Sequence, residues 1–239
     1  NTIGTNTITL TATNAFGSDA ETKVAYITVL DANGMALPIS EGFVGATFVP
    51  VGWDLVNLNA SPTTWVRSTA AGNAPTAGNS MMFDNFAYND ADDDEVRLPG
   101  ANFMGYSSAT LTFDVAYAPY SATFYDGLEV LVSTDCGNTY TSVYSKSYTV
   151  LATAAAQTTS FTPTAAQWRT ETVDLSSYVG NSKVIVAFRN LSGYGNRLFV
   201  DNINLYGVTS ALPPTAGFTA GPTTLCAGNT VAFTNTSTD

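Results

Sequence analysis

The sequence predicts an all-β protein in which a jelly-roll-like β-sandwich is flanked by partial Ig-like domains. Apolar and polar residues alternate with a period of two in many short runs, and helical periodicity is nearly absent. Turn-rich segments separate these runs. Only 11% of the residues are charged, and Thr, Ser, Asn, Gly and Ala take their place, as in extracellular β proteins. Hydrophobic residues make up 45% of the 239 residues, enough to bury a substantial core.

The first predicted element is a β-hairpin. Residues 7–13 and 23–29 both alternate, and Asn14-Ala15-Phe16-Gly17 supplies turn residues between them. Asp31-Ala32-Asn33-Gly34 and Pro38 then mark a linker. Because a lone hairpin cannot bury a core of its own, residues 1–32 are expected to be part of a larger domain.

The central domain is expected to span residues 36–208. Its clearest strands are predicted at residues 109–117, 128–133, 169–175, 183–189 and 198–206. A second linker follows at residues 208–214, stiffened by Pro213-Pro214. The tail, residues 213–239, has one further strand pattern at residues 230–235 and is again expected to be a domain fragment. The chain therefore looks cut from a longer one.

Charge and residue usage exclude several functional classes. The net charge is −11 with only eight basic residues, so neither nucleic acid nor an anionic membrane surface is an expected partner. The absence of histidine excludes Ser-His-Asp triads and His-ligated zinc. No 18-residue apolar run encodes a transmembrane helix. The two cysteines, Cys136 and Cys226, fall in different predicted domains, which argues against a disulfide between them.

An acidic loop is the first candidate metal site. In Asp90-Ala91-Asp92-Asp93-Asp94-Glu95, five of six side chains are carboxylates. Ca²⁺ takes six to eight oxygen ligands and tolerates irregular loops, so it would relieve their mutual repulsion. The alternative is a solvated acidic loop.

The segment Ser133-Thr134-Asp135-Cys136-Gly137-Asn138-Thr139-Tyr140 resembles an Asp box. In that motif the Asp accepts backbone N–H bonds in a hairpin turn, Gly takes a positive φ, and the aromatic residue covers the turn. The motif predicts a folded turn and no catalysis.

Two other groups of residues bear on catalysis and on ligand binding. Asp126 and Glu129 are three residues apart on a strand and should point to opposite faces, which argues against a glycosidase pair. A cluster of aromatic residues suggests a platform for sugar rings, with cover of the sandwich rim or a contact to the neighbouring domain as the alternative. These residues are Tyr117, Tyr120, Phe124, Tyr125 and Tyr194.

Both ends of the chain resemble PKD (polycystic kidney disease) domains. Residues 4–18, with the run Thr7-Ile8-Thr9-Leu10-Thr11-Ala12-Thr13-Asn14, are similar to the last strands of that family. Residues 214–237, with Thr230-Val231-Ala232-Phe233-Thr234-Asn235, are similar to its opening strands. The resemblance implies Ig-like fragments at both ends, although the family's W-x-F-G-D-G centre is missing from each.

The middle, residues 38 to 207, resembles the MAM-like and cleaved-adhesin-like jelly-roll modules of secreted bacterial proteins. The matching stretches are Glu41-Gly42-Phe43, Pro50-Val51-Gly52-Trp53, residues 111–117, residues 126–133, Trp168-Arg169 with Val173-Asp174-Leu175, and Val200-Asp201-Asn202-Ile203. Such modules accompany PKD domains beside pappalysin-type metalloproteases, other hydrolases and adhesins. The HExxH motif of those proteases is absent here.

The resemblance also implies a structural Ca²⁺ that joins the first and last strands. Glu41 and Asp201 match the expected glutamate and aspartate, and Asp84 and Asn85 could add ligands. The alternative is that Asp201 and Asn202 cap a turn while Glu41 is exposed. The expected function is a non-catalytic, calcium-stabilised structural or adhesive module on the bacterial surface, next to further domains of a long chain. A carbohydrate- or substrate-targeting module of a secreted hydrolase is the alternative, so a polysaccharide or a surface protein is the expected partner.

Overall fold

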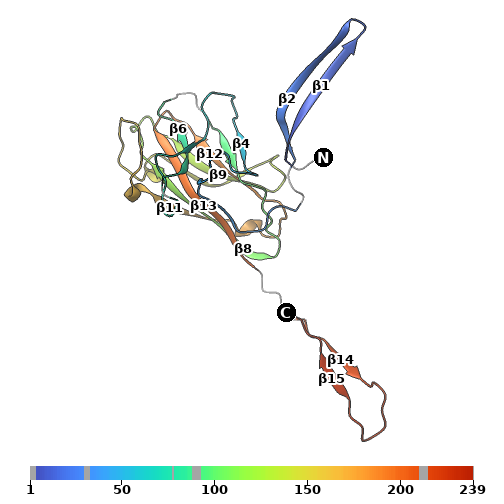
Figure 1. The fold of residues 1–239 in the computed structure, drawn as a ribbon. Helices are drawn as coiled ribbons and strands as arrows, with labels where there is room; N and C mark the ends of the chain where they lie inside the picture. Colours follow the sequence, from blue (N-terminus) through green and yellow to red (C-terminus); the bar gives the residue numbers. More distant parts are fainter. Residues whose placement is uncertain (1–3, 30–32, 77, 88–92, 210–214, 239) are drawn as a thin grey trace.

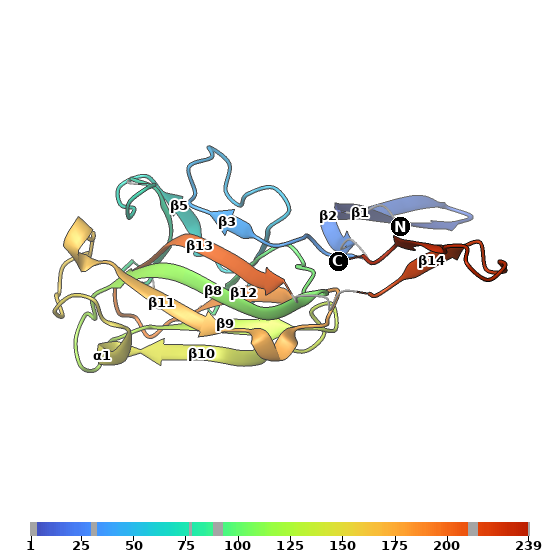
Figure 2. The ribbon, with the colours of Figure 1, turned by 90° about the horizontal axis from the view of Figure 1, so that it is seen from below.

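Two antiparallel sheets form a β-sandwich in the middle of the chain (Figures 1 and 2). A computed structural model describes residues 4–29, 33–76, 78–87, 93–209 and 215–238. The five-stranded sheet has the order β10(Thr141–Ser147), β9(Gly127–Ser133), β12(Ile185–Leu191), β7(Glu95–Arg97), β4(Asp54–Val56). The six-stranded sheet has the order β11(Arg169–Asp174), β8(Tyr106–Tyr117), β13(Arg197–Thr209), β6(Ser80–Asp84), β5(Val66–Ser68), and β3(Ile39–Glu41) also pairs with β13. The predicted all-β sandwich is confirmed.

The alternation seen in the sequence builds the core between the sheets. Along β8, every second side chain from Leu111 to Tyr117 is fully buried and faces the other sheet. Every second residue of β9 and β12 faces back toward β8 and belongs to the same core. The ring of Phe113 meets that of Phe188 on β12 edge to face, with centroids 5.0 Å apart. This packing joins the two layers at the centre of the sandwich.

A bulge in β13 changes which side chains face the core. Leu198 and Val200 point inward, and after the bulge Ile203 and Leu205 do so, which reverses the parity of the strand. Asn202 lies at the bulge with φ of 47°. Asp201, which follows the inward-facing Val200 and precedes the bulge, lies on the outer face of the six-stranded sheet.

Part of that outer face is covered by a second, smaller core. Phe199 of β13 and Ala116 of β8 pack there against Ala71 and Phe161. The loop between β5 and β6 and the segment between β10 and β11 provide this cover. Polar side chains on this face are therefore buried although they point away from the main core.

Each end of the chain forms a two-stranded hairpin outside the sandwich (Figure 1). β1(Gly4–Asn14) pairs with β2(Gly17–Val29), and β14(Phe218–Gly221) pairs with β15(Ala232–Asn235). Asn14 Oδ1 accepts the N–H of Phe16 at 2.8 Å, as expected for the predicted turn. Apolar side chains such as Leu10 and Phe218 are more than two-thirds exposed. The assignment of these hairpins to PKD-like domains and the domain boundaries stay predictions.

The five clearest strands of the central domain were all predicted within a few residues. The alternation pattern does not predict several shorter strands, including β3, β4, β5 and β7, because a run of three residues is too short to show alternation. Helical structure is limited to α1(Tyr148–Leu151) and the 3₁₀ turns η1(Ala165–Gln167) and η2(Ser176–Tyr178) in the described part of the chain. None of these helices has the length and apolarity needed to cross a membrane.

Candidate functional site

Two buried carboxylates lie side by side on the outer face of the six-stranded sheet. Asp114 on β8 is directly opposite Asp201 on β13 in the strand register. Asp201 is fully buried and Asp114 is 6% exposed. Burial raises the pKa of Asp201 to about 6, and the neighbouring charge of Asp114 adds to this, while hydrogen bonds from Asn73, Asn202 and Thr76 oppose it. Like charges placed opposite each other destabilise a sheet, so this pair needs compensation.

The loop between β5 and β6 supplies donors to both carboxylates. The N–H of Asn73 donates to Asp201 Oδ2 at 2.8 Å, and its side-chain Nδ2 donates to Asp114 Oδ2 at 2.9 Å. Asn202 repeats the pattern, with its N–H on Asp201 Oδ1 at 2.7 Å and its Nδ2 on Asp114 Oδ2 at 2.8 Å. The two asparagines thus bridge the two acids.

Oxygen atoms crowd around the hydroxyl of Thr76. Its Oγ1 lies 3.0 Å from Asp201 Oδ2, 3.0 Å from Asn202 Oδ1 and 3.3 Å from the carbonyl oxygen of Asn73. A hydroxyl carries one hydrogen and can satisfy only one of these acceptors. The group of hard oxygen atoms left over has the chemistry that Ca²⁺ prefers.

The first strand of the sandwich lies beside this oxygen cluster. Glu41 pairs with Ile203, two residues beyond Asp201 on β13. A Cβ on Gly42 would lie 2.3 Å from Thr76 Cγ2, so the chain packs closely against Thr76 here. Glu41 Oε1 accepts the N–H of Phe43 and of Gly42. The structure therefore brings Glu41 and Asp201 into one neighbourhood.

Asp84 and Asn85 lie elsewhere. Asp84 pairs in register with Arg197, four residues before Asp201, and Arg197 Nε donates to Asp84 Oδ2 at 2.9 Å. Asn85 is buried and exchanges side-chain hydrogen bonds with Asn190. Neither side chain joins the cluster around Asp201. The residues that lie beside Asp201, where Asp84 and Asn85 are predicted from the sequence, are Asp114, Asn73 and Thr76.

The acidic loop is only partly described, since Asp90 and Asp92 lie outside the described residues. Asp93 is exposed, and its Oδ1 accepts the N–H of Ser192 at 3.3 Å. Asp94 and Glu95 are buried: Asp94 Oδ1 accepts the N–H of Leu58 at 2.8 Å, whereas Glu95 forms ion pairs with Arg97 and Arg189. No group of three or more acidic or cysteine side chains suited to a metal occurs within the described ranges. Calcium at this loop stays a prediction.

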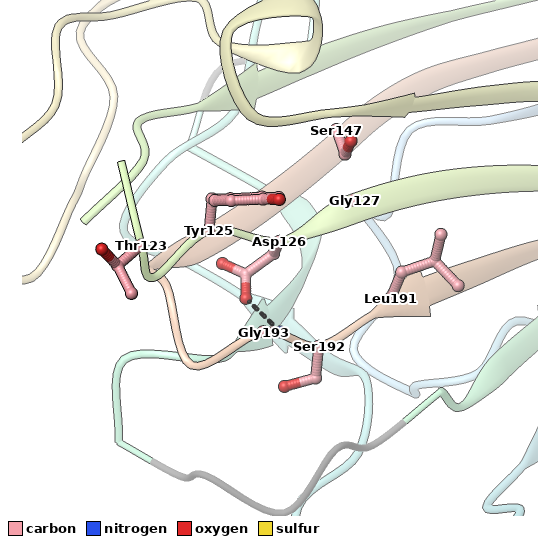
Figure 3. A pocket seen from close by; sticks show the side chains of 8 residues that line it. All are labelled: Thr123, Tyr125, Asp126, Gly127, Ser147, Leu191, Ser192 and Gly193. Atoms are coloured by element: carbon pink, nitrogen blue, oxygen red, sulfur yellow. Dashed lines mark hydrogen bonds between the residues drawn. The ribbon is translucent and has the colours of Figure 1, made fainter. Parts of the chain in front are cut away.

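Asp126 holds a glycine-rich loop against the start of β9. Its Oδ1 accepts the N–H of Gly193 at 2.9 Å (Figure 3). Its Oδ1 also accepts the N–H of Gly195 at 3.0 Å, and its Oδ2 accepts that of Asn196 at 2.7 Å. Burial raises the pKa of Asp126, while these donors oppose the shift. Glu129 lies instead near Arg189, with 3.6 Å between their charged atoms. The two acids therefore have separate partners.

Tyr117 was wrongly predicted as a ligand-binding residue. It is fully buried because it continues the inward-facing positions of β8. Its hydroxyl accepts the N–H of Asp126 at 2.6 Å and donates to Asp126 Oδ2 at 3.1 Å. Tyr117 therefore supports the loop from below.

The other aromatic residues do gather at the rim of the sandwich. Phe124, Tyr125 and Tyr194 are about 40% exposed. Phe124 contacts Tyr194 at 5.8 Å between ring centroids and Tyr120 at 6.2 Å. Beside them lies a pocket of about 350 Å³ (Figure 3). Its lining includes Thr123, Tyr125, Ser147, Leu191 and Ser192.

The predicted Asp box has the expected geometry. Asp135 Oδ1 accepts the N–H of Thr139 at 2.9 Å and Oδ2 accepts its hydroxyl at 2.6 Å, while Gly137 has φ of 86°. These hydrogen bonds lower the pKa of Asp135 to about 2. Cys136 and Cys226 are both free and exposed, and no disulfide joins them.

Comparison with solved structures places the sandwich among known folds. The K1 cleaved adhesin domain of Lys-gingipain from Porphyromonas gingivalis W83 is similar over 72% of this chain and 98% of that domain, with 19% identity and a TM-score of 0.52. The central domain has the cleaved-adhesin-like β-sandwich fold. The K3 domain of the same protein follows with 16% identity, coverage of 71% and 98%, and a TM-score of 0.49.

A xylan-binding domain, CBM22-1 of Paenibacillus barcinonensis Xyn10C, is also similar, with 12% identity, coverage of 72% and 95%, and a TM-score of 0.44. No protein-family model matches the chain. No curated protein sequence matches it either.

Proposed function

We propose that this chain is a non-catalytic, calcium-stabilised adhesive module of a large secreted or cell-surface bacterial protein, with PKD-like domains on either side. The observation that carries the proposal is the group of buried oxygen atoms around Asp201. Buried acids that join β8 and the last strand, β13, to the β5–β6 loop are suited to hold the fold together outside the cell. The small proportion of charged residues and the resemblance of both ends to PKD domains support the extracellular setting.

The oxygen atoms around Asp201 fit a calcium ion. Asp201, Asn202 and the carbonyl of Asn73 would hold it, and Thr76 Oγ1 would turn its lone pair toward it. Glu41 of β3, which is opposite Ile203 in the register, would be a further ligand. The ion would supply two positive charges to a face where Asp114 and Asp201 lie opposite each other. These residues would then tie β3, β13 and the β5–β6 loop together, which is a structural role.

A non-catalytic role is supported by the way that the acids are used. Asp126, Glu95 and Glu171 are buried and each accepts several hydrogen bonds or ion pairs from the protein. The chain also has no histidine to act as a general acid or base.

Thermal melting with and without calcium tests the proposal. Removal of Ca²⁺ with EGTA should lower the melting temperature, by about 5–10 °C if the ion is present at 100 times its Kd. Asp201→Asn should lose this response, whereas Asp19→Asn, which changes an exposed acid of β2, should keep it. An unchanged melting temperature in metal-free wild-type protein would refute calcium stabilisation.

The exposed aromatic residues favour a second candidate function, the targeting of a polysaccharide for a secreted hydrolase. Phe124, Tyr125 and Tyr194 keep about 40% of their surface exposed at one rim. Rings of this kind stack on the apolar faces of sugars. Binding of a polysaccharide by the isolated chain would support this function, and these exposed rings at the rim are the candidate binding site.

A further inference from the structure

The pocket at the rim has the size and the preformed walls of a ligand site. Its volume of about 350 Å³ falls in the range of small-molecule pockets, roughly 300–1,000 Å³. It lies where the loop between β8 and β9 meets the loop between β12 and β13 and the end of β10. Figure 3 shows Thr123, Tyr125, Ser147, Leu191 and Ser192 around this space.

The walls of the pocket are fixed by buried contacts. Asp126 accepts three backbone N–H groups of residues 193–196, and a Cβ on Gly193 would lie only 2.0 Å from the carbonyl oxygen of Tyr125. Asn196 continues the network, since its Oδ1 accepts the N–H of Phe161 at 2.8 Å and its Nδ2 donates to the carbonyl of Thr159 at 2.9 Å. A site held in this way loses little entropy on binding.

Tyr125 is supported from behind by a second tyrosine. The rings of Tyr125 and Tyr148 lie 4.8 Å apart at 36°, and the N–H of Tyr148 donates to the carbonyl of Asp126 at 3.2 Å. Tyr148 has φ of 48°, which is uncommon for a residue with a bulky side chain. Tyr125 is thus held beside the pocket while 39% of its surface remains exposed.

A row of rings continues from the pocket along the rim. Tyr194 contacts Phe124 at 5.8 Å, Phe124 contacts Tyr120 at 6.2 Å, and Tyr120 contacts Phe86 at 6.2 Å. Each contact is edge-on or tilted, so the rings brace one another. The row offers several apolar faces in sequence, which suits a ligand made of repeated units.

The charges of the residues that line the pocket favour an uncharged ligand. The exposed Asp93, whose Oδ1 accepts the N–H of Ser192 at 3.3 Å, adds a negative charge nearby that disfavours an anionic one. No Lys or Arg lines it, and its one acid, Asp126, is 1% exposed and already accepts four hydrogen bonds. Lys146, which precedes Ser147 on β10, forms an ion pair with Glu171 at 2.6 Å. The groups available to a ligand are the hydroxyls of Thr123, Ser147 and Ser192 beside the ring of Tyr125.

We propose that this pocket binds one sugar unit of an uncharged polysaccharide against Tyr125, and that Phe124 and Tyr194 contact the neighbouring units. Pyranose rings combine apolar C–H faces with hydroxyl edges, which matches aromatic rings next to serine and threonine hydroxyls. This proposal rests on the second candidate function, the targeting of a polysaccharide, and names the class of polysaccharide that is bound. It does not depend on calcium at Asp201.

Affinity gel electrophoresis and calorimetry against soluble xylan, β-1,4-galactan, β-glucan and mannan test the site, with alginate and a sulfated glycan as charged comparisons. At least one neutral polysaccharide should retard the wild-type protein, and the charged ones should not. Tyr125→Ala and Tyr194→Ala should each weaken binding about tenfold or more. Tyr125→Phe should keep most of the affinity, because it keeps the ring.

Tyr206→Ala is the matched control, since Tyr206 is 42% exposed on β13 but lies outside the pocket and the row of rings. Melting curves of each variant would show that it is folded. Absence of binding to every neutral polysaccharide, preference for charged ones, or equal binding by wild type and Tyr125→Ala would overturn the proposal. A protein partner lost on Tyr125→Ala, without glycan binding, would also overturn it. If EGTA still lowers the melting temperature in those cases, calcium stabilisation stands and the sugar site alone fails.

Discussion

Asp114 and Asp201 lie directly opposite each other on β8 and β13, and both are buried on the outer face of the sheet. The two acids share donors, since Asn73 and Asn202 each reach both of them. They also join elements far apart in the sequence, because Asn73 comes from the β5–β6 loop. The stability of the sandwich should therefore depend strongly on this pair.

Asp201→Ala should lower the free energy of unfolding by about 1–3 kcal/mol, because the partly buried N–H groups of Asn73 and Asn202 lose their acceptor. Urea denaturation followed by fluorescence measures this change. Asp19→Ala, at an exposed position of β2, is the control and should change the free energy by less than about 0.5 kcal/mol. A similar small effect at Asp201 would show that the network contributes little.

Gly195→Ala should disturb the loop that packs against Asp126 and Tyr125 without altering Asp114 and Asp201. A Cβ there would lie 2.3 Å from Asp126 Oδ2 and 2.8 Å from Tyr125 Cα, so the loop must move. We expect a loss of about 1–3 kcal/mol, as for other overpacked sites. Gly100→Ala is the control, because nothing lies within 4 Å of its added Cβ. Equal unfolding midpoints for the two variants would contradict the close packing described here.

The fold was predictable because long strands carry their own periodicity. β8 and β13 alternate over many residues, so their existence was clear from the sequence alone. The bulge at Asn202 was not predictable, since nothing in Val200-Asp201-Asn202-Ile203 tells where the register shifts. That bulge decides that Ile203 and Leu205, rather than Asn202 and Asn204, face the main core.

The candidate sites were predictable only in part, because local sequence patterns do not show which loop covers which strand. Asp201 and Glu41 were found through a resemblance, and Tyr125 and Tyr194 through their aromatic neighbours. Asp114 looked like an ordinary polar position of a half-exposed strand, and Asn73 and Thr76 looked like loop residues. Their roles depend on which loop covers the sheet, which is a tertiary contact that no local pattern contains.

Tyr117→Phe separates support of the loop from contact with a ligand. The substitution keeps the buried ring but leaves the N–H of Asp126 without its acceptor at 2.6 Å. We expect the free energy of unfolding to fall by about 1–3 kcal/mol, with glycan affinity of the folded protein changed less than by Tyr125→Ala. Tyr206→Phe, at an exposed position, should change neither quantity. If Tyr117→Phe abolished binding while stability stayed unchanged, Tyr117 would be a ligand contact after all.

The turn at Asp135 should make stability depend on pH in the acid range. Its hydrogen bonds with Thr139 and Ser133 lower the pKa to about 2 in the folded protein, below the value of about 3.9 expected for an unfolded chain. A depressed pKa stabilises the fold above the unfolded pKa, and this contribution is lost as the pH falls from about 4 toward 2.

Asp135→Ala should therefore melt below wild type at pH 6, and the difference should shrink steadily between pH 4 and pH 2. Differential scanning calorimetry at a series of pH values measures it. Asp174→Ala provides a comparison, because Asp174 also accepts hydrogen bonds at an exposed turn, from Ser176, and its pKa is lowered by them. It should show the same trend at its own turn. A gap between Asp135→Ala and wild type that stayed constant down to pH 2 would mean that the carboxylate charge does not stabilise the turn, and that only the shape of the Asp135 side chain matters there.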